Sequence, residues 1–550
     1  MNLNRRIKIV GVVFIATLLL AFSDPGEKFF EISKNLDIFA SVFKEVNAHY
    51  VDDVNPNKLI KTGIDAMLQS LDPYTNYIPE DLVEDFRTQN TGQYGGIGAM
   101  TQDYENRTFV SMILEGFPAE KGGLKIGDEV IAIDGVDLTV LTREEANQLM
   151  KGQIGTPVEL KVIRYGESNP VTLNFTRAKI KVSNVPFSGI ISNNVGMVKL
   201  TDFTPDAGKE VKAAIVGLIE QGAKGIVLDL RDNPGGLLME AVNVTNVFIP
   251  KGKEVVSTRG KISENNASYK TLNTPVDTEI PVVVLINSGS ASASEIVAGT
   301  LQDYDRAVVV GQRSFGKGLV QVPRPLSYNS QLKVTTAKYY TASGRCIQAL
   351  DYSHRREDGS VGYVPDSLKT AFKTKNGRIV YDGGGVEPDV PLPARTVADV
   401  TLALFQQRLF FDYATQYFYQ HESIAPAREF QLSDQEYLDF VKWAKSKRYT
   451  YESELEEQLS SLEAYAKTET YYNNLEKEFA KLKQFINNYK ENDLLIHKNE
   501  IKVILEDEIA ARYYLERGSV ESNIKYDTEA MEAIRLINDK TRYQQILAGK

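Results

Sequence analysis

The chain has 550 residues, more than a single hydrophobic core usually supports, so we expect three or four domains. Hydrophobic residues make up 42% and charged residues 25%, which is typical of a globular protein with sizeable cores and argues against disorder. A net charge of -10 is unsuited to neutralising a phosphate backbone, so nucleic acid is not an expected partner.

Cysteine and histidine are too few and too scattered to build the usual metal sites. Cys346 is the single cysteine of the chain, so an intramolecular disulfide is excluded. The histidines lack the spacing of a structural zinc site or of a metalloprotease helix. They are His49, His354, His421 and His497. We therefore expect no metal and no cofactor.

The N-terminus has the pattern of an export signal. Residues 1–8 are basic, and residues 9–22 form an apolar run of about 14 residues, shorter than the roughly 20 that span a bilayer. We assign residues 1–23 to a signal peptide or, because Phe22 to Asp24 is not a clean processing sequence, to an uncleaved tether to the inner membrane. A buried N-terminal helix is the remaining alternative. The expected location is the periplasm or cell envelope.

The next two segments differ in their hydrophobic period. In residues 24–91 apolar side chains recur at helical spacing until Asp72-Pro73, because the residue before a proline is disfavoured in a helix. Residues 92–181 instead hold short strand-like runs separated by glycine turns, which predicts a compact strand-rich domain. The runs are residues 109–113, 129–133, 158–163 and 171–175.

The second half of the chain divides into an alternating region and a helical region. Residues 182–395 alternate apolar strands with helical patterns such as 206–221, which predicts an α/β architecture with a largely parallel sheet. The expected strands are residues 226–230, 282–286 and 307–310. Residues 396–550 predict a C-terminal helical domain, with long helical stretches at 452–489 and 501–515. Its role stays open between dimerisation, capping a substrate channel and recruiting an adaptor.

The most informative stretch places a serine at the start of a helix. The strand 282–286 is followed by the small-residue loop Asn287 to Ser292 and then by a helical pattern. At a helix start, unpaired backbone N–H groups and the helix dipole stabilise negative charge. Ser292 is therefore a candidate nucleophile. A phosphate-binding loop is a rival, but the Gly-Lys-Ser/Thr that defines a P-loop is missing.

A serine hydroxyl needs a base, and a lysine is the better candidate in this chain. Lys317 has apolar and glycine neighbours, which would desolvate its ammonium group and lower its pKa. If the following residues continue as a strand, Gln321 lies on the same face as Lys317 and can orient it by a hydrogen bond.

The turn after strand 226–230 is a candidate oxyanion hole. It runs Leu230-Arg-Asp-Asn-Pro-Gly235-Gly236, and its glycines permit unusual backbone angles that expose N–H groups. Taken alone, this turn, the serine loop and the lysine each match many proteins in which they do nothing catalytic.

In combination these stretches resemble a known family, the tail-specific or carboxy-terminal processing peptidases. The resemblance covers residues 39–393, including Gln302-Asp303. It rests on Tyr94-Gly-Gly-Ile-Gly98, Gly116-Phe-Pro-Ala through Gly127-Asp128, the Arg-Asp-Asn-Pro-Gly-Gly turn, Ser290-Ala-Ser-Ala-Ser-Glu295, and Phe315-Gly-Lys317-Gly with Gln321. It implies a multidomain α+β and α/β protein, with a PDZ domain, a crotonase/ClpP-like α/β protease core and helical regions at both ends.

The resemblance also implies roles for individual residues. Ser292 is the nucleophile, Lys317 the general base and Gln321 the third member of the set. The N–H groups of Gly236 and Ala293 form the oxyanion hole. Glu295 and Asp303 are structural rather than catalytic.

The glycine-rich loop at residues 94–98 resembles the loop of PDZ domains that holds a peptide's terminal carboxylate while the peptide adds a strand. By this resemblance Gly96, Ile97 and Gly98 bind the C-terminus of the substrate, which gives a reason for cleaving protein tails. The expected partners are proteins or peptides with accessible C-termini, an adaptor protein and other copies of the chain.

Two alternatives from other classes are kept. The first is a non-catalytic binding or scaffold protein, because the same α/β core occurs in retinoid-binding relatives and a PDZ domain alone holds peptides. The second is an acyl-group enzyme of the crotonase type, which rests on fold analogy alone.

Overall fold

The computed structural model describes residues 25–356, 358–469 and 471–550. The predicted signal or tether at residues 1–23 lies outside these ranges. Within them, no helix is long and apolar enough to cross a membrane. The described chain divides into two units, residues 25–79 with 323–334, and residues 80–322 with 335–550.

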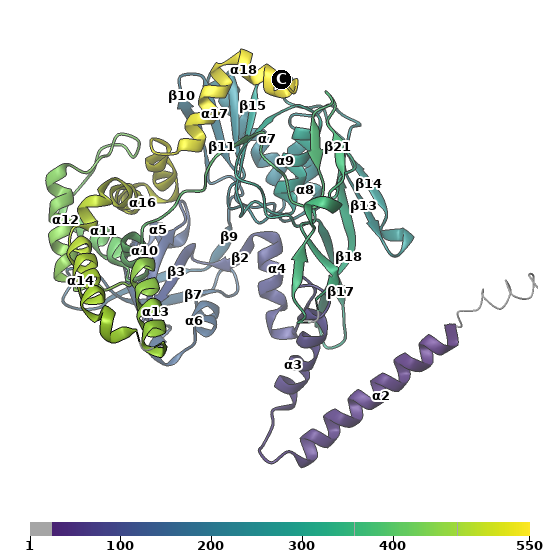
Figure 1. The fold of residues 1–550 in the computed structure, drawn as a ribbon, viewed down its shortest axis with the longest axis horizontal. Helices are drawn as coiled ribbons and strands as arrows, with labels where there is room; N and C mark the ends of the chain where they lie inside the picture. The colour runs from purple at the N-terminus through teal and green to yellow at the C-terminus, as the bar shows by residue number, and fades with distance from the viewer. Residues whose placement is uncertain (1–24, 357, 470) are drawn as a thin grey trace, which may run out of the picture. The chain divides into compact units, whose positions relative to one another are not determined.

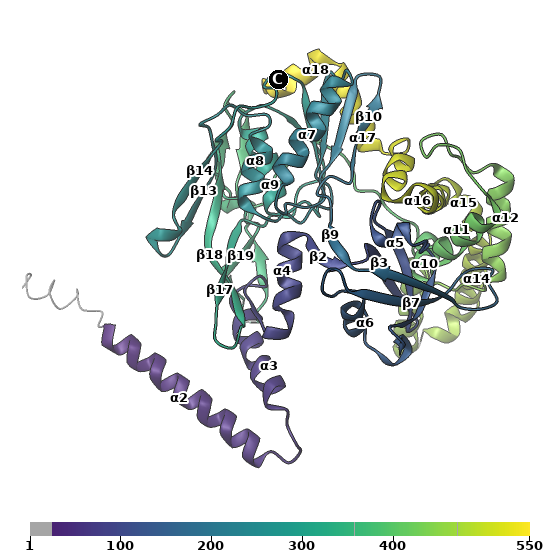
Figure 2. The same cartoon turned by 180° about the vertical axis from the view of Figure 1, so that it is seen from behind.

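The first unit is mainly helical. It holds α2 (Pro25–His49), α3 (Pro56–Gln69) and the short strand β1 (Asn76–Ile78), seen in Figures 1 and 2. Between α3 and β1, the Asp72 carboxylate accepts hydrogen bonds from the N–H groups of Tyr74 and Thr75, at 2.9 and 2.8 Å. This turn ends the helical pattern where the sequence places the break.

The second unit begins with the strand-rich domain. Its strands form a sheet in the order β3-β4-β5-β7-β8, with β6 on β5 and a separate pair β2–β9. The residues that alternate inward along β7 are Val158, Leu160 and Val162, as a one-sided sheet requires. The elements are α4 (Val83–Thr91), β2 (Gln93–Gly96), β3 (Ala99–Tyr104), β4 (Arg107–Ile113), α5 (Pro118–Lys121), β5 (Glu129–Ile133), β6 (Val136–Asp137), α6 (Arg143–Met150), β7 (Pro157–Ile163), β8 (Val171–Thr176) and β9 (Ala178–Lys181).

The α/β core is built on a six-stranded sheet in the order β10-β11-β12-β15-β16-β23. Only the β10–β11 pair is antiparallel, and the other four pairs are parallel, as predicted. The strands are β10 (Phe187–Ser192), β11 (Val195–Lys199), β12 (Gly225–Asp229), β15 (Val282–Ile286), β16 (Val308–Gly311) and β23 (Val390–Pro391). Every residue of β12 and β15 is buried, so this sheet has to be covered on both faces.

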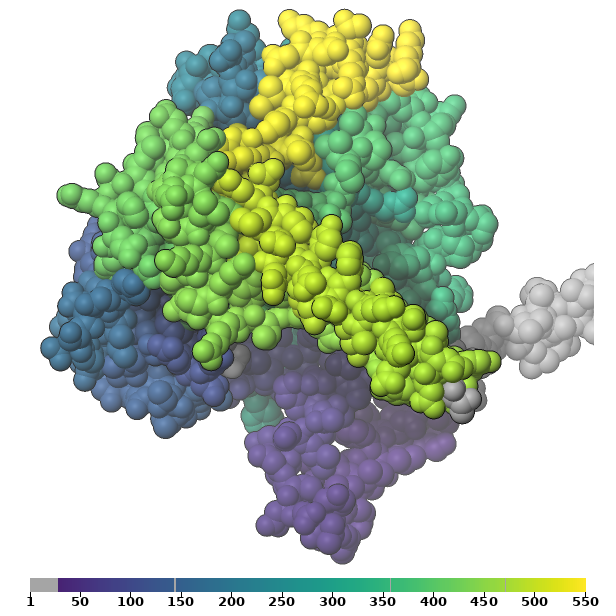
Figure 3. Space-filling model, turned by 60° about the vertical axis from the view of Figure 1, so that its left-hand side comes forward, coloured from purple at the N-terminus to yellow at the C-terminus, as the bar shows by residue number. Residues whose placement is uncertain are grey.

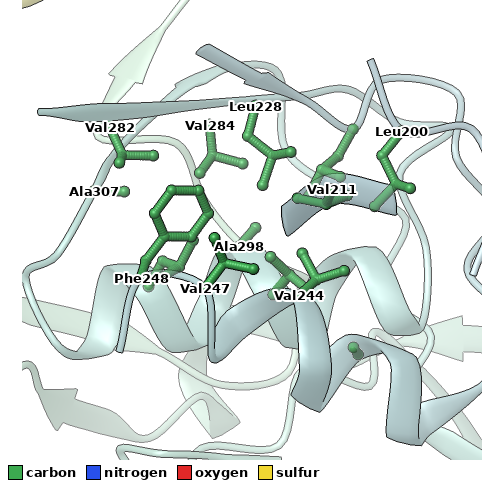
Figure 4. Packing of buried hydrophobic residues seen from close by; sticks show 14 of the residues in the cluster. Leu200, Val211, Leu228, Val244, Val247, Phe248, Val282, Val284, Ala298 and Ala307 are labelled. Carbon is green, nitrogen blue, oxygen red and sulfur yellow. The ribbon is translucent and has the colours of Figure 1, made fainter. Parts of the chain in front are cut away.

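The first face of the sheet is covered by helices that follow its strands in sequence. They are α7 (Ala207–Glu220), α8 (Leu238–Thr245) and α9 (Ala293–Asp303). Figure 4 shows this core, in which Leu228 and Val284 of the strands meet Val244 of α8 and Ala298 of α9.

The second face is covered by the last two helices of the chain, α17 (Thr528–Asn538) and α18 (Lys540–Leu547). Val283 of β15 alternates onto this face and packs in one cluster with Leu536 and Ile537. The Tyr543 hydroxyl donates to the carbonyl of Val282 and accepts from its N–H group, both at 3.0 Å. In Figure 3 these yellow residues lie against the blue and green residues of the core. Residues 396–550 therefore contribute to the α/β core as well as to the C-terminal helical region, because α17 and α18 cover the second face of the core sheet.

Antiparallel strands flank the core. β18 pairs with β13, placing Thr341 opposite Val256, and β17 also pairs with β18. These elements are β13 (Glu254–Gly260), β14 (Ala267–Lys270), β17 (Leu319–Pro325), β18 (Gln331–Thr341), β19 (Leu350–Arg355), β20 (Val361–Tyr363), β21 (Ala371–Lys373) and β22 (Ile379–Tyr381).

The remaining C-terminal helices pack around an aromatic core that includes Phe410, Tyr437 and Phe440. The stretch predicted as helical over 452–489 forms two helices, α13 and α14. Folding back lets Leu459 of α13 pack with Phe479 of α14, which one straight helix could not do. The elements are α10 (Asp399–Gln406), α11 (Leu409–Gln420), α12 (Asp434–Ser446), α13 (Glu454–Thr468), α14 (Tyr472–Lys490), α15 (Asp493–Ile496) and α16 (Lys498–Ile524).

Candidate active site

Ser292 lies where the core strand β15 passes into helix α9. It is the residue immediately before α9 and has φ 56° and ψ -112°. A non-glycine residue in this region is strained by about 1–3 kcal/mol and persists only where its surroundings hold it. The loop before it is held from within the core, because the Ser290 hydroxyl donates to the carbonyl of Leu230 at 2.8 Å.

Glu295 connects the serine loop, residues 287–292, with the loop of residues 312–317, which we call the lysine loop. Its fully buried carboxylate accepts hydrogen bonds from the N–H groups of Ser292 at 2.8 Å and Lys317 at 2.9 Å. The N–H group of Gly316 at 2.7 Å and the hydroxyl of Ser314 at 2.5 Å also donate to it. Burial raises the pKa of Glu295 to about 7, although these four hydrogen bonds act to lower it.

Tyr339 contacts the same two residues, but at their carbonyl oxygens rather than at their N–H groups. It belongs to β18 and is 1% exposed. Its hydroxyl lies 3.0 Å from the carbonyl oxygen of Ser292 and also hydrogen-bonds the carbonyl oxygen of Lys317. Glu295 and Tyr339 together form what we call the inner clamp. Sequence reasoning missed Tyr339, because nothing near it on its strand marks it as a partner of Ser292.

Lys317 is half-buried at the end of a loop that is bonded on both sides. The N–H group of Phe315 donates to the carbonyl of Ser290 at 3.0 Å, and the N–H group of Gly318 donates to Oε1 of Gln348 at 2.7 Å. Gln321 lies on β17, where its Nε2 donates to Oγ1 of Thr335 at 3.1 Å. The orienting role predicted for Gln321 stays a prediction.

The predicted oxyanion turn lies beside the serine loop. The N–H group of Ala291 and the Ser294 hydroxyl both donate to the carbonyl of Asn233, at 3.0 and 2.9 Å. Gly235 has φ 101°, and a Cβ built on it would lie 2.9 Å from Cβ of Ser292. Only glycine therefore fits between this turn and the serine.

Two N–H groups beside Ser292 are available to a ligand. Among the described residues, the N–H groups of Gly236 and Ala293 have no hydrogen-bond acceptor. They belong to neighbouring segments, since a Cβ on Gly235 would lie 2.8 Å from the backbone nitrogen of Ala293. Donors of this kind can bind an oxygen that gains negative charge during a reaction.

Asp303 lies at the far end of α9, away from Ser292. It accepts hydrogen bonds from the Thr341 hydroxyl at 2.6 Å and from the N–H group of Ser343 at 2.9 Å. It also forms an ion pair with Arg345 at 2.9 Å, in which both side chains are 1% exposed. These contacts fix α9 to the end of β18, the strand that carries Tyr339.

The predicted carboxylate loop lies between β2 and β3. The carbonyls of Ile97 and Gly98 accept hydrogen bonds from the N–H groups of Ala119 and Leu114, at 2.8 and 2.9 Å. Their own N–H groups donate no hydrogen bond within the part of the chain that the structure describes. Gly98 has φ 81°, and a Cβ on it would lie 2.5 Å from Cβ of Phe117, so glycine is required. Gly96 ends β2 opposite Ala178.

Comparison with known proteins finds three family models along the chain. The model described as peptidase family S41 matches residues 194–353, the PDZ domain model matches residues 85–163, and the model of a probable PDZ-protease C-terminal helical domain matches residues 400–537.

Curated relatives match more than half of the chain. The carboxy-terminal-processing protease of Bartonella bacilliformis is 39% identical over 347 residues, which is 62% of this chain and 79% of that protein. The carboxy-terminal processing protease CtpA of Bacillus subtilis is 34% identical over 314 residues, 56% of this chain and 66% of that protein. Among solved structures, a photosystem II D1 C-terminal processing protease is 27% identical, with 64% of this chain and 92% of that chain covered and a TM-score of 0.35.

Proposed function

Since the chain belongs to peptidase family S41, the carboxy-terminal processing proteases, we propose that it cuts exported proteins near their C-termini by Ser/Lys catalysis. Membership confirms the predicted family, the serine-peptidase class, and the fold of a PDZ domain beside a peptidase core. The scaffold and crotonase-type alternatives are therefore set aside.

In the proposed reaction Ser292 is the nucleophile and Lys317 the general base. The Ser292 Oγ attacks the carbonyl carbon of the scissile bond while its proton passes to the neutral amine of Lys317. The N–H groups of Gly236 and Ala293 bind the resulting oxyanion. When this intermediate collapses, Lys317 gives the proton to the leaving amine, and an acyl-enzyme remains. Water then hydrolyses the ester, with Lys317 again accepting a proton, and Gln321 orients the lysine.

One observation carries this assignment. The Glu295 carboxylate accepts hydrogen bonds from the N–H groups of both Ser292 and Lys317, two residues that are 25 positions apart. A shared buried acceptor fixes the two loops in one site, as a nucleophile and its base require.

Single substitutions test the two catalytic roles. Ser292→Ala and Lys317→Ala should each abolish peptide cleavage, measured with a quenched fluorescent peptide. The control variants are Ser288→Ala and Lys251→Ala, which change exposed residues of the same types. Full activity in either catalytic variant, with both controls active, would refute the Ser/Lys mechanism.

We further propose that the PDZ domain holds the C-terminal carboxylate of the substrate with the N–H groups of Gly96, Ile97 and Gly98. The support is the pair of unbonded N–H groups at Ile97 and Gly98 within the described chain. A peptide with an amidated C-terminus lacks the charge that these donors bind, so its kcat/KM should fall about tenfold relative to the free acid. Equal rates for the two peptides would contradict this role.

Export and assembly complete the proposal. Residues 1–23 direct the chain to the periplasm or cell envelope, and cell fractionation with and without these residues tests this. We also propose that the enzyme is a homo-oligomer and that an adaptor protein binds it. Exposed apolar side chains on α2, among them Phe29, Phe30 and Leu36, support a covering partner, and the mass in solution tests self-association.

A further inference from the structure

We propose that Glu529, in the first turn of α17, positions both catalytic loops from the second face of the core sheet. It is 298 residues from Arg231 and 217 residues from Gln312, the two residues that it contacts. The proposal rests on the catalytic roles assigned above and gives a function within the active site to the C-terminal region. Figure 1 shows α17 lying along the sheet beside β15.

The first contact is with the oxyanion turn. Arg231 follows Leu230 directly and opens the turn that ends at Gly236. Its guanidinium donates to both carboxylate oxygens of Asp229, the last residue of β12, at 2.8 and 2.7 Å. The other side of the guanidinium donates to Asp527 at 2.6 and 3.0 Å and to Glu529. The turn is thus ion-paired to the start of α17.

These ion pairs lie in a largely dehydrated place. The side chains of Arg231, Asp527 and Glu529 are 15%, 15% and 16% exposed, and that of Asp229 is 1% exposed. Burial lowers the pKa of Arg231, but its pairing with Asp229 and Asp527 outweighs this and holds the pKa well above its usual value. Contacts of this kind are screened less by salt than surface pairs and hold their geometry better.

The second contact is with the lysine loop. Gln312 is the first residue after β16 and opens the loop that ends at Lys317. Its Nε2 donates to Oε1 of Glu529 at 2.5 Å, and its N–H group donates to the carbonyl of Ile286 at 3.0 Å. One oxygen of Glu529 therefore serves the lysine loop, and the other serves the oxyanion turn.

The start of α17 is itself firmly placed. Asp527 caps the helix by accepting from the N–H groups of Glu529 and Ala530, at 3.1 and 2.9 Å. Further along, Ile537 packs so closely on β12 that a Cβ on Gly225 would lie 2.2 Å from its Cγ2. The helix is thus anchored at both ends on the sheet whose loops it contacts. We call Asp527 and Glu529, with Arg231 and Gln312, the outer tether.

Glu529→Gln tests the tether, because it keeps the size of the side chain and removes the charge that binds Arg231. The matched control is Glu532→Gln on the same helix, which removes ion pairs with Arg535 at 3.0 Å and Arg542 at 2.9 Å but contacts neither catalytic loop. For both variants we would measure kcat and KM on a peptide, the melting temperature, and the rate at which a fluorophosphonate probe labels Ser292.

Glu529→Gln should lower kcat and the labelling rate about tenfold or more, because a small misplacement of catalytic groups has effects of this size, while KM stays within about twofold. Glu532→Gln should leave both rates unchanged at a comparable melting temperature. Glu529→Asp keeps the charge and should recover part of the loss.

Equal kcat values in Glu529→Gln and wild type would overturn the proposal, and so would a loss that merely follows the melting temperature in both variants. An inactive wild-type protein would instead refute the proposed peptidase function. The two failures are therefore distinguishable.

Discussion

The two faces of the central sheet are covered in different ways. The first face carries α7, α8 and α9, each of which comes from the chain between two of the sheet's own strands. The second face carries α17 and α18, which follow the helices α10 to α16 in the sequence. The catalytic loops lie where the strands end, so both faces can reach them.

The two faces of the sheet have different roles in the proposed site: one provides reacting groups, and the other positions the segments that carry them. The first face supplies Ser292 and Glu295 at the start of α9, and the inner clamp holds the proposed nucleophile and base by their backbone groups. The second face supplies no reacting group in our proposal, and through Glu529 it holds the segments from which those groups project. Substitutions on the two faces should therefore fail in different ways.

The largest effect is expected on the first face, from Glu295→Gln. The amide keeps the shape but offers a donor where three backbone N–H groups and a hydroxyl already donate, so the two loops separate. We expect kcat to fall about 100-fold, with KM little changed. Steady-state kinetics would show this, with exposed Glu264→Gln as the control. Near wild-type kcat would show that the clamp is dispensable.

Leu536→Ala tests whether the second face belongs to the peptidase core. Leu536 is fully buried in the cluster with Val227 and Val283, so the cavity should lower the free energy of unfolding by about 2–5 kcal/mol. The matched variant on the first face is Leu218→Ala in α7, which is equally buried. In calorimetry both should shift the same unfolding transition. If Leu536→Ala left the transition of the core unmoved, α17 would belong to a separate domain.

Tyr339→Phe should have an intermediate effect on the first face. It leaves the carbonyl oxygens of Ser292 and Lys317 without the hydroxyl, a loss of about 1–3 kcal/mol in stability. We expect kcat to fall about tenfold, because Glu295 still holds the N–H side of both residues. The control is Tyr340→Phe, the next residue on the strand, whose ring lies under Arg259. Equal kcat values in the two variants would contradict the clamp.

The pH dependence gives the finest test of Glu295. Its pKa of about 7 lies above the value of about 4.3 in the unfolded chain, so between these values the folded protein holds a proton that the unfolded chain has released. The free energy of unfolding should therefore fall as the pH rises from about 4.5 to 7 and level off above it. Denaturant titrations at several pH values check this against Glu295→Gln, which should lack this component. The same slope in both proteins would assign the effect to another group.

Activity should change in the opposite direction. The ionised carboxylate can accept all four hydrogen bonds, whereas the protonated form must donate one, so kcat should rise about tenfold between pH 6 and 8. The Glu295→Gln variant should lack this rise in its remaining activity. An unchanged rise in the variant would point to Lys317 instead.

The parts of the site that could be predicted from the sequence are those that have a recognisable pattern within a few consecutive residues. The serine after a buried strand, the lysine among glycines and the Asn-Pro-Gly-Gly turn each have a local pattern, and the structure brings their segments together. The inner strand 282–286 also has an apolar residue at every position, which indicates burial on both faces. The apolar pattern of this strand thus indicates that helices or strands must pack on both faces of the sheet.

The sequence could not show which helices pack on the second face of the core sheet. The pattern of residues 528–538 predicts an amphipathic helix, but an amphipathic pattern does not name the surface that it packs on. Tyr339 and Glu529 were missed for the same reason, since their partners lie on distant segments and depend on tertiary structure. The pairing of Gln321 with Thr335 likewise depends on which strand lies beside β17.

The position of α17 and α18 after Ser292 and Lys317 in the chain also sets the order in which the parts of the enzyme are completed. A ribosome makes the chain from its N-terminus, so Ser292 and Lys317 exist before the helices that cover the second face are synthesised. A nascent or truncated chain would carry the proposed nucleophile and base but lack Glu529. With the outer tether as we propose it, the peptidase acquires full activity only after α17 has been synthesised and has packed on the core sheet.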